Sequence, residues 1–320
     1  RKIPNMAHPD APVGVLDTDN PEVKRVGEPS VFNFKPKDHV QLAQDLDLVD
    51  FDAATKDSGN KFYYLKNEAV FLEQALIMYA MNILRKHGFT PFITPDVARE
   101  EILHGIGFNP RGNESNVYAL EDEKACLVAT AEITLGGYHA GEILSKDKLP
   151  LYYCGLSHCF RREAGSWGKT VRGLNRLHQF DKVEIVEIAH PDTSYERLEA
   201  MKEHVANLLR KLELPFRVLR LCGGDMSFTS AMTYDYEVWS AAQELWLEVS
   251  SVSNFETFQA NRMKLRFKDK DGNIRLVHTL NGSALALPRI VAALLENNQC
   301  EEGIRVPKAL QKYTGFEIIK

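Results

Sequence analysis

Two stretches with the composition of strands lie between two long stretches with the periodicity of helices. The strand-like stretches, 149–160 (LPLYYCGLSHCF) and 178–189 (HQFDKVEIVEIA), are dense in aromatic and β-branched residues. The first helical stretch, 66–87, repeats apolar residues every three or four positions and ends before Gly88. The second helical stretch covers 194–212. Successive strands between such helices favour an antiparallel sheet with helices packed on it, which is an α+β fold.

The remaining elements agree with this arrangement. Residues 263–280 (MKLRFKDKDGNIRLVHTL) predict a hairpin, and a last helix is expected over 284–298 with Pro288 near its start. Residues 89–95 (FTPFITP) predict a short strand whose final proline suits the edge of a sheet. The first sixty residues are rich in Pro, Asp, Gly and Asn, so they predict loops punctuated by short strands. The sequence contains no glycine-rich dinucleotide motif, Walker motif or internal repeat.

The composition argues against several classes of protein. The formal net charge is -5, so the chain lacks the overall basic field that dominates non-specific nucleic-acid binding. No apolar run approaches the ~20 residues of a membrane span and the first residues lack a secretory signal, so a cytosolic or organellar-matrix protein is expected. The cysteines are odd in number and form no C-x-x-C pair, which favours reduced core residues over disulfides or a zinc site. They are Cys126, Cys154, Cys159, Cys222 and Cys300.

Charged and aromatic residues gather in one segment, FRREAGSWGKTVRGLNRLHQFDKVE. It predicts Arg161 and Glu163 on one face of a strand, followed by a glycine-rich turn. After the turn, Arg176, Phe180 and Glu184 share a face if the strand is regular. In such a hairpin the arginines can bind phosphates, the aromatic ring can stack on a base, and a carboxylate can bind an amine. Charge alone does not separate this interpretation from a solvated hairpin.

The segment resembles the second of three motifs that define class II aminoacyl-tRNA synthetases, F-R-x-E followed by a loop and R-x-x-x-F. Residues 85–95 (RKHGFTPFITP) resemble the first motif, a helix and a strand that ends in proline. Residues 282–296 (GSALALPRIVAALLE) resemble the third, a strand-to-helix segment that carries one arginine, Arg289. The three motifs occur in the family's order and on the expected elements.

Further segments are similar to seryl-tRNA synthetases in particular. They are IPNMAHPDAPVG, ATAEIT, RGLNRLHQFDKVE, TYDYEVW, EVSSVSNFETFQANR and TLNGSALA, and the resemblance runs from Ile3 to the C-terminus. It implies a class II antiparallel sheet flanked by helices, with 1–320 as one catalytic domain and 1–60 as its loop-rich first part. The coiled-coil arm that grips tRNA in this family would precede this region and is absent from the sequence.

The resemblance implies a serine–tRNA ligase. Such an enzyme uses ATP and Mg²⁺ to convert L-serine to seryl-adenylate, releases pyrophosphate, and transfers the seryl group to the 3′ end of tRNA(Ser) and of tRNA(Sec). It also implies a homodimer, and no membrane partner.

The family pattern assigns a role to each site residue. Arg161 would hold the ATP α-phosphate and the serine carboxylate, Glu163 the adenine edge, and Phe180 with Arg289 would sandwich the adenine. The residues assigned to ATP are Arg161, Glu163, Arg176, Phe180, Glu248, Ser251 and Arg289, of which Glu248 and Ser251 would also hold Mg²⁺. Those assigned to serine are Thr130, Glu132, Arg161, Glu184, Asn281 and Ser283. The catalytic residues would be Arg161, Glu248 and Arg289.

Several alternatives stay open. Thr130 and Glu132 also suit a capping pair at a helix start, and His178 suits a packed histidine. For the whole chain, the alternatives are a paralogue with a non-charging role and a non-enzymatic RNA-binding module, and the net charge argues against the second. The chain departs from the family pattern at Val252, which replaces a cysteine, and at Asn261, which replaces an arginine.

Overall fold

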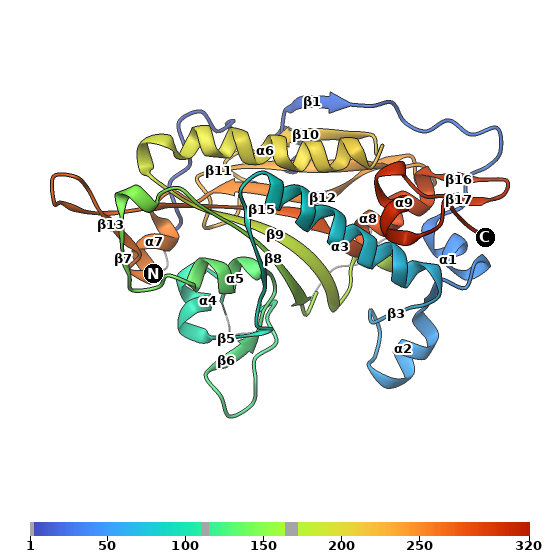
Figure 1. The fold of residues 1–320 in the computed structure, drawn as a ribbon, viewed down its shortest axis with the longest axis horizontal. Helices are drawn as coiled ribbons and strands as arrows, with labels where there is room; N and C mark the ends of the chain where they lie inside the picture. Colours follow the sequence, from blue (N-terminus) through green and yellow to red (C-terminus); the bar gives the residue numbers. More distant parts are fainter. Residues whose placement is uncertain (1–2, 110–114, 164–171) are drawn as a thin grey trace.

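One large sheet runs through the molecule (Figure 1). The computed structural model describes residues 3–109, 115–163 and 172–320. The strands of this sheet are β1 Glu22–Val26, β4 Thr90–Ile93, β8 Leu151–Phe160, β9 Gln179–Ala189, β10 Phe216–Arg220, β11 Met232–Ser240, β12 Leu245–Asn254 and β15 His278–Ala286. Their order is β1-β10-β11-β12-β15-β9-β8-β4. Neighbours are antiparallel except β4 and β8, which are parallel.

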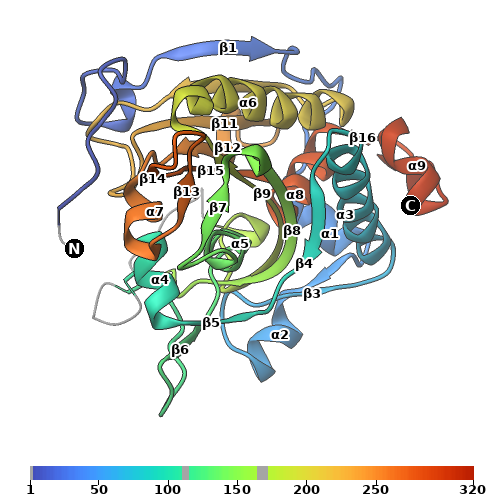
Figure 2. The ribbon, with the colours of Figure 1, turned by 60° about the vertical axis from the view of Figure 1, so that its left-hand side comes forward.

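Helices cover both faces of this sheet (Figures 1 and 2). The helices on one face are α3 Glu68–Lys86, α6 Ser194–Lys211 and α8 Leu287–Asn297, and α9 Lys308–Thr314 packs on α3. Those on the other face are α4 Glu100–Ile106, α5 Ala131–Gly137 and α7 Phe258–Met263. None of the helices in the described part of the chain combines the length and apolar content of a membrane span.

Smaller elements surround the sheet. Two short helices near the N-terminus are α1 His39–Asp45 and α2 Phe51–Asp57. The minor strands are β2 Val49–Asp50, β3 Tyr64–Leu65, β5 Val97–Arg99, β6 Ala125–Leu127, β7 Ile143–Ser145, β13 Arg266–Lys268, β14 Ile274–Leu276, β16 Gln299–Cys300, β17 Gly303–Arg305 and β18 Ile318–Ile319. Short 3₁₀ turns span Asp17–Asp19, Lys146–Lys148, Gly173–Asn175 and Pro191–Thr193.

The alternation of side chains along β9 separates the core from a polar face. Val183 and Ile185 are fully buried in the main core, which contains residues of α3, α6 and α8. Lys182 and Glu184 alternate with them, so their side chains point to the other face of the sheet. That face is only partly covered by helices, and the strands present polar side chains there.

The α+β architecture expected from the sequence is confirmed. The long helices begin and end within two residues of the first two expected stretches, and the hairpin of β13 and β14 turns at Gly272, whose φ is +83°. The proline-ended stretch forms β4 at the edge of the sheet, as expected. The last helix begins at Leu287 rather than at Ala284, because β15 continues to Ala286 and Pro288 lies in the first turn.

The expectation of loops and strands over the first sixty residues is wrong in part, because α1 and α2 form there. The side chain of Asp38 accepts a hydrogen bond from the Gln41 amide, and that of Asp50 accepts one from the Ala53 amide. Aspartates counted as turn residues therefore act as helix N-caps. Such short helices carry too little periodicity to be recognised from the sequence.

The expected strand through Arg161 and Glu163 is also wrong. Strand β8 ends at Phe160, and Glu163 has a φ of +46°, which is left-handed backbone. Of the glycine-rich turn predicted after Glu163, the part with Gly165, Trp167 and Gly168 lies outside the described residues, and Gly173 begins a 3₁₀ turn. Arg176 precedes β9 and follows a 3₁₀ turn, so the regular strand expected from Arg176 to Glu184 begins only at Gln179.

Candidate active site

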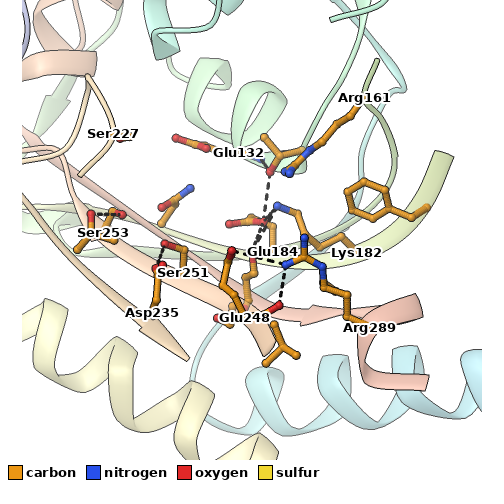
Figure 3. A pocket seen from close by; sticks show the side chains of 18 of the residues that line it. Glu132, Arg161, Lys182, Glu184, Ser227, Asp235, Glu248, Ser251, Ser253 and Arg289 are labelled. Carbon is orange, nitrogen blue, oxygen red and sulfur yellow. Dashed lines mark hydrogen bonds and ion pairs between the residues drawn. The ribbon is translucent and has the colours of Figure 1, made fainter. Parts of the chain in front are cut away.

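A cleft of about 500 Å³ opens on the polar face of the sheet, a volume typical of small-molecule sites. Strands β9, β11, β12 and β15 form its floor, and α5, the segment after β8 and the first turn of α8 form its walls (Figure 3). All of the predicted site residues line this one cleft: Thr130, Glu132, Arg161, Glu163, Arg176, Phe180, Glu184, Glu248, Ser251, Asn281, Ser283 and Arg289. The structure therefore brings together residues that lie as far apart in the chain as Thr130 and Arg289.

A β-bulge in β12 puts Glu248 and Ser251 on the same side of the sheet. Residues three apart on a regular strand face opposite sides. Here Glu248 pairs with Glu237 of β11, and Ser251 pairs with Asp235, so one extra residue of β12 lies between them. Such bulges redirect side chains, often beside active sites. Both oxygen-bearing side chains consequently face the cleft.

Asp235 lies next to this pair and was not among the site residues predicted from the sequence. Its Oδ1 accepts a hydrogen bond of 2.5 Å from Ser251 Oγ. Burial and the nearby Glu248 carboxylate raise the pKa of Asp235 to about 8, although the Ser251 hydrogen bond opposes the shift. The three side chains gather oxygen atoms at this acidic end of the cleft, where the Glu248 carboxylate would attract a cation.

Two arginines point into the cleft from opposite walls (Figure 3). Arg161 follows β8, its Nε donates to the Ala129 carbonyl at 3.3 Å, and its guanidinium lies 5.2 Å from the ring centroid of Phe180. Arg289 lies in the first turn of α8, and its Nη1 donates to the Glu248 carbonyl at 2.6 Å. Backbone acceptors thus fix both planar groups before any ligand binds.

Glu163 and Arg176 pair with each other at the rim. Arg176 Nη1 lies 3.0 Å from Glu163 Oε2, and the Glu163 amide donates to Asn116 Oδ1 at 2.7 Å. These contacts hold the left-handed backbone at Glu163 in place. The wall of the cleft that is formed by the second class II motif, residues 160–184, therefore presents a cation and a carboxylate side by side.

At the end of the cleft away from Asp235, the lining side chains are polar and mostly buried. Glu184 Oε2 accepts hydrogen bonds from Thr130 Oγ1 at 3.2 Å and from Ser283 Oγ at 3.4 Å, and it forms an ion pair with Lys182. Asn281 lies two residues before Ser283 on β15 and also lines the cleft.

Glu132 is a second carboxylate at this end. It is 8% exposed, and its Oε1 accepts a hydrogen bond of 2.7 Å from Gln259 Nε2. Burial and the charge of Glu184 raise its pKa to about 7, against the effects of Gln259, Lys182 and Arg161. A buried carboxyl near neutral pKa in a cleft is a common feature of functional sites.

Thr130 caps the helix α5 and also lines the cleft. Its hydroxyl oxygen accepts from the Glu132 amide at 3.2 Å, which caps α5, and its proton is donated to Glu184. The capping alternative is therefore correct for the local helix, while the side chain still lines the cleft. His178 stacks on Phe62 and hydrogen-bonds with the Tyr118 hydroxyl at 2.7 Å, as expected for a packed histidine.

Lys182 also lines the cleft and was not among the site residues predicted from the sequence. It is two residues before Glu184 on β9, and the alternation that placed Phe180 and Glu184 on one face also places Lys182 there. The available signal was therefore the strand period. A lysine is almost never fully buried unless it is paired, and only the fold reveals that this one is buried.

Comparisons with known proteins agree with this geometry. Residues 117–298 match the family model described as tRNA synthetase class II core domain (G, H, P, S and T). The chain is 58% identical to a serine–tRNA ligase of Treponema denticola over 99% of this chain and 76% of that protein.

Two solved structures are also similar. A seryl-tRNA synthetase from Pyrococcus horikoshii complexed with ATP matches with a TM-score of 0.96 and 41% identity, over 99% of this chain and 76% of that chain. A cytoplasmic serine–tRNA ligase from Naegleria fowleri in complex with AMP matches with a TM-score of 0.93 and 28% identity, over the same shares. With the class II core and the seryl-specific relatives in agreement, the chain belongs to the seryl-tRNA synthetase family of class II aminoacyl-tRNA synthetases.

Proposed function

We propose that this protein is a serine–tRNA ligase, which forms seryl-adenylate from L-serine and ATP and transfers the seryl group to tRNA(Ser) and tRNA(Sec). The observation that carries the proposal is the polarity of the cleft. One end has buried carboxylates and hydroxyls that suit a small substrate with an ammonium and a hydroxyl group, and Arg161 reaches into the cleft beside Glu132 at that end. The complexes of the two structural relatives with ATP and AMP support a nucleotide in the same cleft.

In this proposal the first step depends on placement. Arg161 binds one oxygen of the serine carboxylate and one of the α-phosphate, so the attacking oxygen and the phosphorus are held within reach. Its fixed charge stabilises the negative charge that develops on the phosphate, and Arg289 contributes at the other wall. Phe180 and Arg289 hold the adenine between them, and Glu163 accepts from its amino edge, while Arg176 faces the terminal phosphates.

Glu248 and Ser251 fit a Mg²⁺ ion bound together with phosphate oxygens. They are a carboxylate and a hydroxyl brought to one side by the bulge, and Mg²⁺ prefers one or two such oxygen ligands plus substrate phosphates and water. Within the described residues, no three acidic, histidine or cysteine side chains gather to hold a metal alone. When bound, the ion would neutralise phosphate charge. Glu248 would hold the ion, and Asp235 fixes the Ser251 hydroxyl.

The first experiment measures serine-dependent exchange of pyrophosphate into ATP. We expect exchange with L-serine. Alanine should be poorer by on the order of 10⁴-fold, because it lacks the hydroxyl that the site hydrogen-bonds, and threonine by on the order of 10²-fold, because its additional methyl group does not fit a pocket shaped for serine. Equal activity with alanine would overturn the assignment of the pocket. Exchange without subsequent charging of tRNA(Ser) would favour the paralogue with a non-charging role.

Serine binding should depend on pH through Glu132. The ionised carboxylate attracts the substrate ammonium, but in the empty cleft its pKa is about 7 because of burial and Glu184. As the pH falls below 7, the protonated fraction of Glu132 grows, and we expect the dissociation constant for serine to rise by up to about tenfold per pH unit. Titrations monitored by intrinsic fluorescence would measure it. A Glu132→Gln variant should bind weakly without this slope, and the same slope in that variant would refute the assignment.

We also propose a homodimer. The helix α3 exposes Phe71 and Met78, which are seven residues apart and share a face, and Ile93 of β4 is 84% exposed. In the described sheet β4 has a strand on one side only. An apolar helix face beside an open edge strand suits a two-fold contact with a second copy. The buried thiols of Cys154, Cys159 and Cys222 fit a reducing compartment, the cytosol or an organellar matrix.

The dimer is tested by sedimentation at micromolar concentration. We expect the parent to sediment as a dimer and Met78→Glu to shift the equilibrium toward monomer, because a charge would be buried in the contact. Lys86→Glu, an exposed change near the end of the same helix, serves as the control. A monomeric parent at that concentration would contradict the proposal.

A further inference from the structure

We propose that Lys182 is a specificity-determining residue that decides which carboxylate of the pocket receives the substrate ammonium. By pairing with Glu184, Lys182 leaves Glu132 as the site for the ammonium and makes the Glu184 end a site for a neutral hydroxyl. The inference rests on the proposed activation of serine in this cleft. It concerns a residue to which neither motif nor family pattern assigned a role.

The ion pair is built into one strand. Lys182 and Glu184 lie two residues apart on β9, so both side chains project from the same face into the cleft (Figure 3). Only 6% of the Lys182 side chain and 1% of the Glu184 side chain are exposed. Lys182 Nζ also donates to Ser283 Oγ at 3.4 Å. An ammonium has three donors, so one N–H of Lys182 remains for a ligand.

The two carboxylates therefore differ in what they can accept. Glu184 already has Lys182 as a counter-ion and hydroxyl donors from Thr130 and Ser283. Glu132 accepts from the neutral amide of Gln259, and among the described residues no basic side chain forms an ion pair with it. Gln259 is held in turn by Thr279, whose hydroxyl donates to its Oε1 at 2.7 Å. Glu132 is thus fixed in position with its charge open to a ligand.

Charge balance then orients the substrate. With both carboxylates ionised, the two acids and Lys182 carry a net charge of −1, which one ammonium at Glu132 neutralises. A second cation at Glu184 would approach the Lys182 ammonium in a nearly water-free pocket, where like charges repel strongly. A hydroxyl can instead donate to Glu184 and accept the remaining N–H of Lys182. Alanine leaves these two groups without a ligand partner, which is the physical basis for its rejection.

The test compares three variants of the 320-residue chain. Lys182→Met removes the positive charge of the pair, Glu184→Gln removes the negative charge, and the double variant removes both. Steady-state pyrophosphate exchange gives kcat and KM for serine and for alanine. We expect Lys182→Met to lower the serine-over-alanine ratio of kcat/KM by on the order of 10²-fold, because Glu184 can then take the ammonium and the hydroxyl is no longer required. We expect Glu184→Gln to raise the KM for serine by a similar factor, because an unpaired cation then faces the ammonium.

The double variant separates this role from a structural one. Removal of both charges restores the balance, so we expect it to bind serine at least tenfold more tightly than Glu184→Gln does. Lys148→Met, at an exposed lysine, is the matched control and should behave like the parent. If Lys182→Met fails to fold, as judged by circular dichroism and ATP binding, the comparison of the double variant with Glu184→Gln still decides. If Glu184→Gln fails instead, the serine-over-alanine ratio of Lys182→Met decides.

The outcomes are distinct. An unchanged serine-over-alanine ratio in Lys182→Met, or a double variant with no tighter binding of serine than Glu184→Gln, would overturn the role of Lys182. A Lys182→Met variant that folds and binds ATP but has lost all adenylate formation with either amino acid would also overturn it, since Lys182 would then act on the phosphates. A parent without serine-dependent exchange would instead refute the proposed function itself.

Discussion

Arg161→Lys is expected to lower the rate of adenylate formation by on the order of 10²-fold or more, the scale seen when a preorganised electrostatic group is removed. The guanidinium is planar and is held by the Ala129 carbonyl and the face of Phe180. It can therefore bind a carboxylate and a phosphate at once in a fixed mutual geometry. A lysine ammonium keeps the charge but loses the planar fork, so the two reactants are no longer aligned.

A single-turnover measurement with saturating ATP and serine isolates this step. Folding should be unaffected, because Arg161 is partly exposed and its side chain forms one hydrogen bond with the backbone. Arg99→Lys, at a side chain that is 81% exposed, is the matched control. If the Arg161 variant stayed within a few-fold of the parent, Arg161 would not bridge the reactants, and the assignments made around it would have to be redrawn.

Glu248→Gln should lower pyrophosphate exchange by on the order of 10²-fold and raise the Mg²⁺ concentration needed for half the maximal rate by about tenfold or more. The amide keeps the size of the side chain but removes the charge that a divalent cation requires. Glu248 Oε2 also lies 3.7 Å from Arg289 Nη1, but the Glu248 carbonyl still anchors Arg289 at 2.6 Å in the variant. The loss should therefore come mainly from the metal.

The shift in Mg²⁺ dependence distinguishes this role from a general disturbance of the cleft. Binding of Mn²⁺ in the presence of ATP, followed by electron paramagnetic resonance, gives a second readout that does not depend on turnover. Glu244→Gln, at the exposed turn between β11 and β12, should leave both measurements unchanged. A Glu248 variant with a lower rate but the same affinity for Mn²⁺ would show that Glu248 is not a metal ligand.

The chemistry of the site could be anticipated from residue types, but its assembly could not. The strand period on β9 places Phe180, Lys182 and Glu184 on one face, which is a local property. The same rule fails on β12, where it would place Glu248 and Ser251 on opposite faces. The bulge that unites them depends on pairing with β11, and pairing partners are not visible in a single sequence.

The sequence by itself predicted the two long helices and the strands between them, and the motifs that it shares with the family supplied the assigned side chains of the cleft, though not Lys182 or Asp235. These follow from hydrophobic period and from motif order, which are local patterns. Only the tertiary structure decided which charged side chains of the cleft pair with each other and which stay open to a ligand. It buries Lys182 against Glu184, leaves Glu132 open, and sets Asp235 beside Ser251, because these contacts join strands and helices far apart in the chain. The energy of a charge depends on the partners and solvent around it, so its role is determined only once the fold has brought those partners together.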